Sequence, residues 1–292
     1  MIPSEIIKKI KTLELSTRHI VSNIFSGNYH SIFKGQGISF AELREYQIGD
    51  DIRLIDWKNT EKMGTPYIKL FEEERELTVI LAIDLSASGL FGSQEKSKRD
   101  IILEIAAILG FSAAKNKDKI GLLLFTDHVE HYLPPKKGKN SMLRVLRDIF
   151  CFKPIHKKTN IADACNALLK NLKKKSIVFL ISDFIDQGFE KNIQQLNKKH
   201  DLIPIVIKDP WEGQLPPSLS LRLKDHESDT EATIHSNTTT NEIYQNICNS
   251  TELKLQRFFK NNQCHSINIY TEKDYILPLK HYFKYRKQKN HV

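Results

Sequence analysis

The centre of the chain carries continuous apolar runs that stop at polar residues. These runs occupy residues 77–85, 119–127, 176–184 and 201–210, and the first of them reads LTVILAIDL. A strand without in-and-out alternation is typical of a parallel sheet that is covered on both faces. The four runs therefore predict buried strands, and HVEHYLPP over 128–135 predicts a short fifth strand closed by its two prolines.

The segments between these strands have the apolar spacing of helices. That spacing recurs over residues 96–117, 140–150, 159–175 and 188–200. Strands that alternate with helices predict an α/β fold, in which a doubly wound, mainly parallel sheet has helices on both faces. We place this domain at residues 76–210.

The two flanks have different patterns. Residues 1–30 predict an amphipathic helix, and residues 31–76, which are rich in glycine and charge, predict a small strand-rich appendage. We therefore treat 1–75 as an N-terminal region. Residues 211–292 are expected to complete the fold with a hairpin, a helix, a strand and a closing helix, over 219–235, 240–262, 264–271 and 275–287.

The composition is that of a soluble globular protein. Hydrophobic residues make up 40% and charged residues 27% of the 292 positions. The sequence has no apolar run long enough to span a bilayer and no signal-peptide core, so we expect no integral membrane segment and a cytoplasmic location. Its four cysteines form no CxxC pair, which argues against a zinc site or a disulfide framework.

The formal charge of +9 raises the alternative of a basic nucleic-acid-binding protein. The excess is mostly lysine scattered in short groups, without an arginine-rich stripe and interleaved aromatic residues. That alternative predicts binding with a steep salt dependence. We expect lysine-rich solvated faces and no nucleic-acid partner.

Oxygen side chains collect where the predicted strands end. Asp84, Ser86 and Ser88 leave the first strand, Asp183 leaves the third, and Thr159 stands at a helix start. Each of these residues alone has an ordinary explanation as a turn or cap residue. Together, at the carboxyl edge of one parallel sheet, they predict a site for a hard divalent cation, Mg²⁺, with Mn²⁺ or Ca²⁺ as alternatives. These segments hold no histidine or cysteine ligands, which argues against zinc there.

The DLSAS motif at 84–88, the distant Thr159 and the Asp183 after FLIS resemble the metal-ion-dependent adhesion site of von Willebrand factor A domains. The resemblance implies that Ser86, Ser88 and Thr159 bind the metal directly, and that Asp84 and Asp183 act mostly through water. An acidic residue of a partner protein would then complete the metal's coordination shell.

The stretch upstream, from GQGISF through GDDIRLIDW, closely resembles the signature of the bacterial domain of unknown function 58 family. The residues that carry this resemblance are Gly35, Gly37, Phe40, Leu43, Arg44, Tyr46, Gly49, Asp50, Asp51, Arg53, Ile55, Asp56 and Trp57. The resemblance implies a von Willebrand factor A-like domain and a partnership with a MoxR-type AAA+ ATPase. It also implies an adaptor or co-chaperone role in stress tolerance or protein maturation.

The charged residues of this signature have two interpretations. Asp50, Asp51 and Asp56 are expected to pair with Arg44, Arg53 and Arg75, with Trp57 anchoring the unit to the main sheet. The competing interpretation, an active site, lacks a nucleophile beside a base, since residues 31–127 contain no histidine. We favour an architectural role for these charges.

The sequence therefore favours a non-enzymatic, metal-dependent protein-interaction module. No GxxxxGK[ST] motif is present, so ATP use would belong to the partner. The alternative is a divalent-metal-dependent hydrolase or nuclease. Two-metal hydrolysis needs a denser carboxylate cluster than Asp84, Asp183, Asp186 and Asp127 offer.

Overall fold

The computed structural model describes residues 12, 13, 15, 17, 21, 38–73, 77–90, 96–213, 221–224, 231–234 and 238–289. The helix predicted over 1–30 lies almost entirely outside the described residues, as do Gly35, Gly37 and Arg75. Of the predicted hairpin, the structure describes the two strands β8 (Leu221–Lys224) and β9 (Glu231–Ile234), which pair antiparallel.

The core of the molecule is a six-stranded sheet with the order β10-β7-β6-β3-β4-β5. Its strands are β3 (Thr78–Asp84), β4 (Lys119–Phe125), β5 (Val129–Lys137), β6 (Ile177–Ser182), β7 (Asp201–Lys208) and β10 (Ile267–Tyr270). All neighbours are parallel except β4 and β5, which are antiparallel. This confirms the mainly parallel sheet predicted from the apolar runs.

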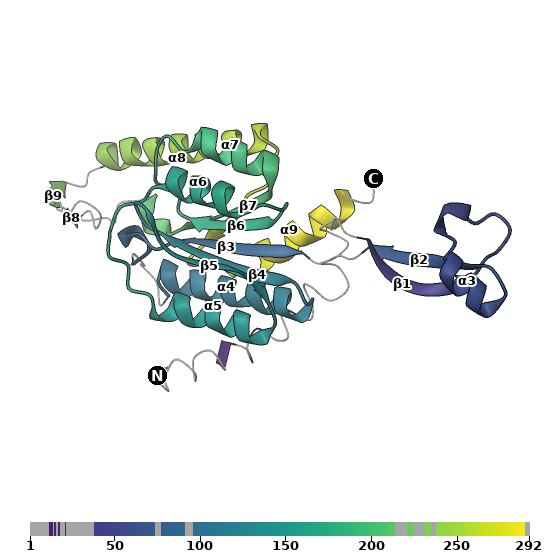
Figure 1. Ribbon diagram of the computed structural model, residues 1–292. Helices are drawn as coiled ribbons and strands as arrows, with labels where there is room; N and C mark the ends of the chain where they lie inside the picture. The colour runs from purple at the N-terminus through teal and green to yellow at the C-terminus, as the bar shows by residue number, and fades with distance from the viewer. Residues whose placement is uncertain are drawn as a thin grey trace.

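Helices cover both faces of the sheet (Figure 1). One face carries α4 (Lys98–Lys115), α5 (Lys139–Cys151) and α9 (Ile276–Lys289), and the other carries α6 (Ile161–Asn171), α7 (Glu190–Lys199) and α8 (Thr238–Asn261). Along β3, Val79 and Leu81 pack in the first layer, whereas Ile80 and Ala82 pack in the second. Burial on both sides explains why this strand is apolar at every interior position.

The edge strand β5 runs through the two prolines that were predicted to end it. Pro134 and Pro135 lie within β5, which continues to Lys137. β5 has a neighbour on one side only, and its register with β4 shifts between Ile120 and Leu122. A proline lacks the backbone N–H of a ladder bond, and an edge strand with an irregular register tolerates that loss.

The direction in which the chain adds strands reverses beside β3. From β3 the sheet continues to β4 and β5 on one side, and to β6, β7 and β10 on the other. In open α/β sheets, ligands bind outside the carboxyl ends of the strands at this reversal. Asp84 is the last residue of β3 and Asp183 follows the last residue of β6, so both stand at this point.

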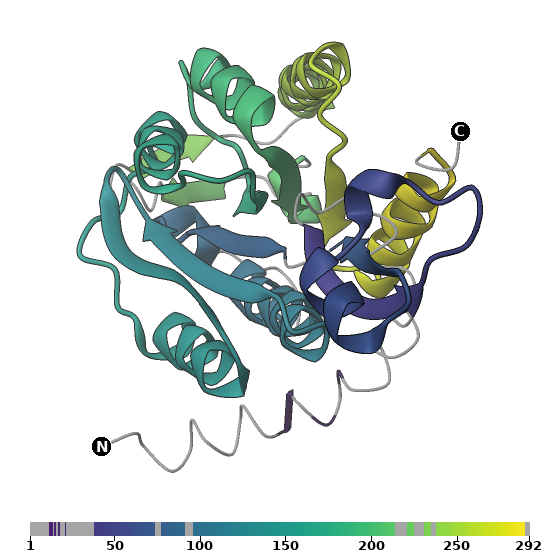
Figure 2. The ribbon, with the colours of Figure 1, turned by 45° about the vertical axis from the view of Figure 1, so that its right-hand side comes forward.

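The appendage is built from β1 (Ile38–Glu45) and β2 (Tyr67–Glu73), which pair antiparallel, with η1 (Ile52–Leu54) and α3 (Trp57–Met63) between them. Figures 1 and 2 show it projecting from the end of the sheet where β3 begins. The carboxyl edge that carries Asp84 is the opposite end of β3. The appendage and this edge are therefore two separate surfaces.

Two of the charge pairs predicted in the appendage are present. Nη2 of Arg44 lies 2.9 Å from Oδ1 of Asp50, and Nη2 of Arg53 lies 3.0 Å from Oδ2 of Asp51. The third carboxylate, Asp56, is 3.4 Å from Nζ of Lys69. Asp56 also caps α3, because its side chain accepts hydrogen bonds from the first backbone N–H groups of that helix.

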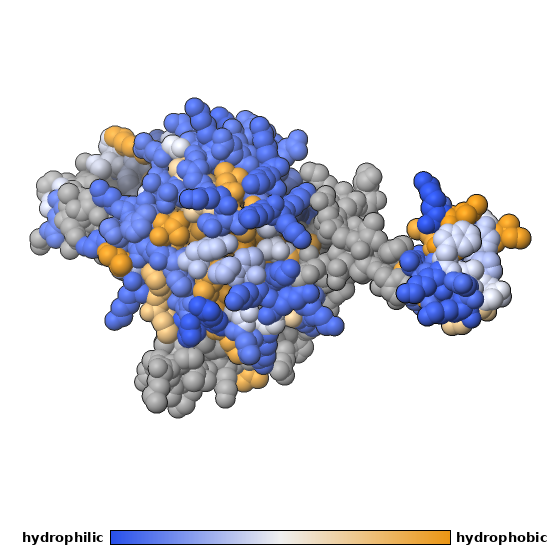
Figure 3. Space-filling view, in the orientation of Figure 1, coloured by the Kyte–Doolittle hydropathy of each residue, from blue (hydrophilic) through white to orange (hydrophobic). Residues whose placement is uncertain are grey.

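The expectation that Trp57 anchors the appendage to the main sheet is wrong. Trp57 is 68% exposed at the first position of α3. Ile48, Ile52 and Met63 are also exposed, and Figure 3 shows apolar side chains gathered at the tip of the appendage. The size of an aromatic side chain favours burial, but none of the layers in the described part of the chain covers Trp57.

Candidate functional site

The loop after β3 is a tight turn formed by Asp84. Oδ1 of Asp84 accepts a hydrogen bond of 2.9 Å from the backbone N–H of Ser86, which is the geometry of an Asx-turn. The short helix η2 (Ala87–Leu90) follows and returns the chain, so that Oγ of Ser88 lies 2.9 Å from Oγ of Ser86. Asp84 and Ser86 are buried, and Ser88 is half-buried.

Ser182 connects this turn to the neighbouring strand β6. Its hydroxyl donates a 2.7 Å hydrogen bond to Oδ2 of Asp84 and accepts one of 3.0 Å from the N–H of Phe184. Both oxygens of Asp84 are therefore engaged. Sequence reasoning missed Ser182, although a polar residue beside Asp183 at the end of an apolar run was the available signal.

Asp183 is held from both sides. Its Oδ1 accepts a hydrogen bond of 3.2 Å from the N–H of Ile185, and its Oδ2 accepts one of 3.0 Å from Nζ of Lys98. Between them, Phe184 adopts a φ of +58°, a left-handed conformation that costs a non-glycine residue free energy. The buried Phe184 ring packs edge-on against Phe259, with the ring centroids 5.3 Å apart, and this packing offsets that cost.

Lys98 is the principal residue that sequence reasoning missed. It is the first residue of α4, and its side chain is only 1% exposed. Its ammonium group contacts both Asp183 and Glu212, which lies in η3 (Pro210–Glu212) after β7. The backbone oxygen of Glu212 accepts a hydrogen bond from the hydroxyl of Tyr244 in α8. The lysine thus joins the end of β6 to η3 at the carboxyl edge of the sheet, and Glu212 in turn binds α8.

The loop that carries Thr159 is fastened to the same edge by three hydrogen bonds. The N–H of Ala87 donates to the oxygen of Lys157, and the N–H of Asn160 donates to the oxygen of Thr126, each at 2.9 Å. The N–H of Ile161 donates to Oδ2 of Asp186 at 2.8 Å. The half-buried Thr159 therefore stands in a loop that touches the ends of β3, β4 and β6, and Asn160, not Thr159, caps α6.

The structure thus places all five predicted metal residues at one edge of the sheet. Hydrogen bonds link Asp84 with Ser86, Ser86 with Ser88, and Asp84 through Ser182 with the strand that leads to Asp183. Thr159 comes to this edge through its loop. Metal coordination by these residues remains a prediction.

The electrostatics of the site are set by burial. Burial and, after it, the charge of Asp183 raise the pKa of Asp84 to about 7, although the hydrogen bonds from Ser182 and Ser86 lower it. Burial lowers the pKa of Lys98, but the negative charges of Asp183 and Glu212 raise it by more. The pKa of Lys98 is therefore above its ordinary value. Asp183 and Glu212 contact the ammonium group of Lys98, and the buried Asp84 is a further acidic group close to Asp183, so the site favours additional positive charge.

The donor set partly fits Mg²⁺. Adjacent oxygen ligands of an octahedral Mg²⁺ lie about 2.8–3.0 Å apart, given metal–oxygen distances of about 2.0–2.1 Å. The 2.9 Å between the hydroxyl oxygens of Ser86 and Ser88 suits this spacing, as well as the hydrogen bond that they form. Lys98, however, already supplies a positive charge to Asp183. We therefore expect weak metal binding.

The strand order, the antiparallel edge strand and the Asp-x-Ser-x-Ser turn at the reversal define a von Willebrand factor A-like protein. The family described as "Protein of unknown function DUF58" matches residues 42–252. This span covers more than half of the 292 residues, and the chain belongs to that family.

Similar proteins are known from mycobacteria and Bacteroides. Uncharacterized proteins of Mycobacterium bovis and Mycobacterium tuberculosis are each 28% identical over 222 residues, which cover 75% of this chain and 70% of theirs. The crystal structure of the conserved hypothetical protein BatB from Bacteroides thetaiotaomicron is similar with a TM-score of 0.50 and 13% identity, over 74% of this chain and 98% of BatB. At this identity the similarity supports the fold alone.

Among the described residues, no helix combines the length and the apolar content that crossing a membrane requires.

Proposed function

We propose that this protein is a non-enzymatic protein-interaction module whose partner docks over the turn at residues 84–88 in a Mg²⁺-dependent way. Mn²⁺ and Ca²⁺ are the alternative ions. The observation that carries the proposal is the pair of hydroxyls of Ser86 and Ser88, 2.9 Å apart, beside the carboxylates of Asp84 and Asp183 at the reversal of the sheet.

In this proposal the chain's own residues hold the ion and leave part of its shell open. The hydroxyls of Ser86, Ser88 and Thr159 provide neutral oxygen ligands, and Asp84 and Asp183 provide charge. The bound ion supplies the positive charge that attracts an acidic side chain of the partner. Ser88 is the more exposed of the two serines, so we propose that the partner's side chain reaches the ion from the side of Ser88.

A non-catalytic role agrees with how these groups are engaged. The hydroxyls of Ser86 and Ser88 contact each other, and within the described part of the chain neither is hydrogen-bonded to a histidine. Both oxygens of Asp84 are occupied by Ser86 and Ser182, which leaves this carboxylate poorly placed as a general base. The hydrolase alternative would require metal-dependent turnover that is lost in Asp183→Ala.

The partner that we propose is a MoxR-type AAA+ ATPase, or a client protein that presents an acidic residue. This part of the proposal rests on the resemblance of residues 35–57 to the family signature, which implies a partner of this kind. The corresponding role is that of an adaptor or co-chaperone in stress tolerance or protein maturation.

The test compares partner capture with Mg²⁺ and with EDTA. Replacing both Ser86 and Ser88 by alanine removes two ligands and no charge, so the fold should persist while the ion is held less well. We expect capture of the cognate ATPase to weaken about tenfold, which corresponds to about 1.4 kcal/mol. Ser250→Ala is the matched control, because it removes an exposed hydroxyl on α8.

Equal capture in Mg²⁺ and in EDTA, by protein with an unchanged melting temperature, would contradict the metal-dependent mechanism. The exposed apolar side chains of Ile48, Trp57 and Met63 on the appendage would then be the surface to test next.

A further inference from the structure

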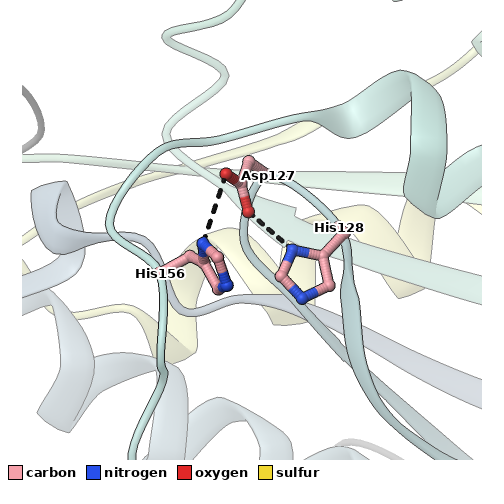
Figure 4. Close-up of side chains that lie close together, drawn as sticks. All are labelled: Asp127, His128 and His156. Carbon is pink, nitrogen blue, oxygen red and sulfur yellow. Dashed lines mark hydrogen bonds and ion pairs between the residues drawn. The ribbon is translucent and has the colours of Figure 1, made fainter.

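A second cluster of metal-binding side chains lies at the same edge of the sheet. Asp127 follows β4, His128 stands in the turn to β5, and His156 lies in the loop between α5 and α6. Nδ1 of His128 is 2.7 Å from Oδ1 of Asp127, and Nδ1 of His156 is 3.6 Å from Oδ2 of Asp127. Figure 4 shows the three side chains converging from two separate segments.

The backbone around these ligands is fixed independently of the cluster. Glu130 in β5 accepts hydrogen bonds from the N–H groups of Ile155 and His156, at 2.8 and 3.2 Å, and one of 2.6 Å from the hydroxyl of Thr126. One carboxylate therefore holds the loop with His156 close to the strand end before Asp127. The imidazole rings of His128 and His156 meet edge-on, with centroids 4.3 Å apart.

The ligand types select the ion. Two imidazole nitrogens and one carboxylate oxygen, with ligand atoms all within 4.8 Å of one another, suit Zn²⁺ and similar borderline metals. Mg²⁺ prefers an all-oxygen shell, so this cluster differs in chemistry from the hydroxyl and carboxylate site at Asp84. Sequence reasoning argued against zinc because the candidate segments held no histidine, whereas the fold brings His128 and His156 beside them.

We propose that Asp127, His128 and His156 bind a single Zn²⁺-class ion, with solvent completing its coordination. The ion would fasten the loop over 152–160 to the turn between β4 and β5. That loop contains Thr159, and its Lys157 oxygen accepts the hydrogen bond from Ala87, so the ion would also stabilise one wall of the site at residues 84–88. This inference does not depend on Mg²⁺ binding or on the partner.

Neighbouring charges limit the expected affinity. Lys157 and Lys158, both exposed, follow His156 directly, and their positive charges oppose a cation. The carboxylates of Asp127 and Glu130 act in the opposite direction. All three ligands are exposed or half-buried, so solvent reaches the ion. We therefore expect weaker binding than at a closed structural zinc site with four protein ligands.

The experiment titrates the full-length, tag-free protein with Zn²⁺ by calorimetry and with Co²⁺ by visible absorption. Wild-type protein should bind one equivalent, and saturation with Zn²⁺ should raise its melting temperature. His128→Asn and His156→Asn should each weaken binding about tenfold or more and abolish the rise in melting temperature. His281→Asn, an exposed histidine on α9, is the matched control and should bind as wild type does.

Binding of Zn²⁺ that is unchanged in both His128→Asn and His156→Asn would overturn the proposal, and so would the absence of binding by the wild-type protein at millimolar Zn²⁺. The Ser86→Ala, Ser88→Ala double variant separates the two sites. It should keep the Zn²⁺ stoichiometry whether or not it captures a partner, so failure of one proposal leaves the other open to test.

Discussion

Replacing Lys98 by methionine should lower the free energy of unfolding by about 3–5 kcal/mol. The lysine ammonium is buried between the carboxylates of Asp183 and Glu212, and methionine removes its charge while filling much the same volume. Two carboxylates would then share a buried space without a counter-charge, which is the costly outcome of breaking a buried ion pair. Urea unfolding at pH 7, followed by circular dichroism, measures the change.

Lys96→Met provides the matched control. Lys96 is two residues away and pairs with Glu104 at 2.7 Å, but its side chain is largely exposed. Exposed pairs contribute about 0–1 kcal/mol, so this variant should unfold almost as wild type does. Adding Asp183→Asn and Glu212→Gln to Lys98→Met should recover part of the loss. Equal stabilities for Lys98→Met and Lys96→Met would show that Lys98 does not neutralise buried charge.

The second large expected effect is a pH dependence of the free energy of unfolding that originates at Asp84. Burial and the charge of Asp183 raise its pKa from 3.8 to about 7 in the folded protein. The folded state therefore holds this proton more tightly than the unfolded state does. The resulting stabilisation is fully present below about pH 4 and is lost as the pH rises toward 7. In EDTA, this group should make wild-type protein less stable at pH 8 than at pH 5.

Asp84→Asn isolates this contribution. Asparagine keeps an oxygen for the N–H of Ser86 and carries no charge, so it lacks the titration. Each pKa unit corresponds to about 1.4 kcal/mol, and the stability of Asp84→Asn relative to wild type should rise by about 2–3 kcal/mol between pH 5 and pH 8. Urea unfolding of both proteins across this pH range gives the comparison.

Parallel stability curves for Asp84→Asn and wild type would contradict a raised pKa at Asp84. Saturating Mg²⁺ is a useful addition, because a cation at the proposed site favours the ionised carboxylate. The ion should then reduce the pH dependence of the wild-type protein and leave that of Asp84→Asn unchanged.

The sequence predicted the fold well because the signals for strands and helices are local. A strand buried on both faces must be apolar at each interior position, and β3, β4, β6 and β7 all fall within the predicted runs. The prolines of β5 were misjudged, since whether a proline ends a strand depends on its place at an edge of the sheet. The position of a strand within the sheet cannot be derived from its sequence pattern.

In the candidate site, too, some features could be predicted from the local sequence and others could not. Asp84, Ser86 and Ser88 stand at alternate positions of one turn, and their geometry follows from the hydrogen bond that Asp84 forms two residues ahead. The burial of Lys98 could not be predicted in this way. It stands in a run with Lys96 and Arg99 that looks like a solvated helix start, and Glu212 meets it only across the sheet.

By itself, then, the sequence determined the order and type of the strands and helices in the domain at residues 76–210 and the oxygen-rich turn after β3, because those depend on residues close together in the chain. The tertiary structure decided which charged side chains are buried and which candidate metal-binding side chains lie close together. Lys98 with Asp183 and Glu212, and His128 with His156, come together only because parallel strands end at a common edge. The energy of a charge depends on the solvent and counter-charges around it, and packing alone sets those.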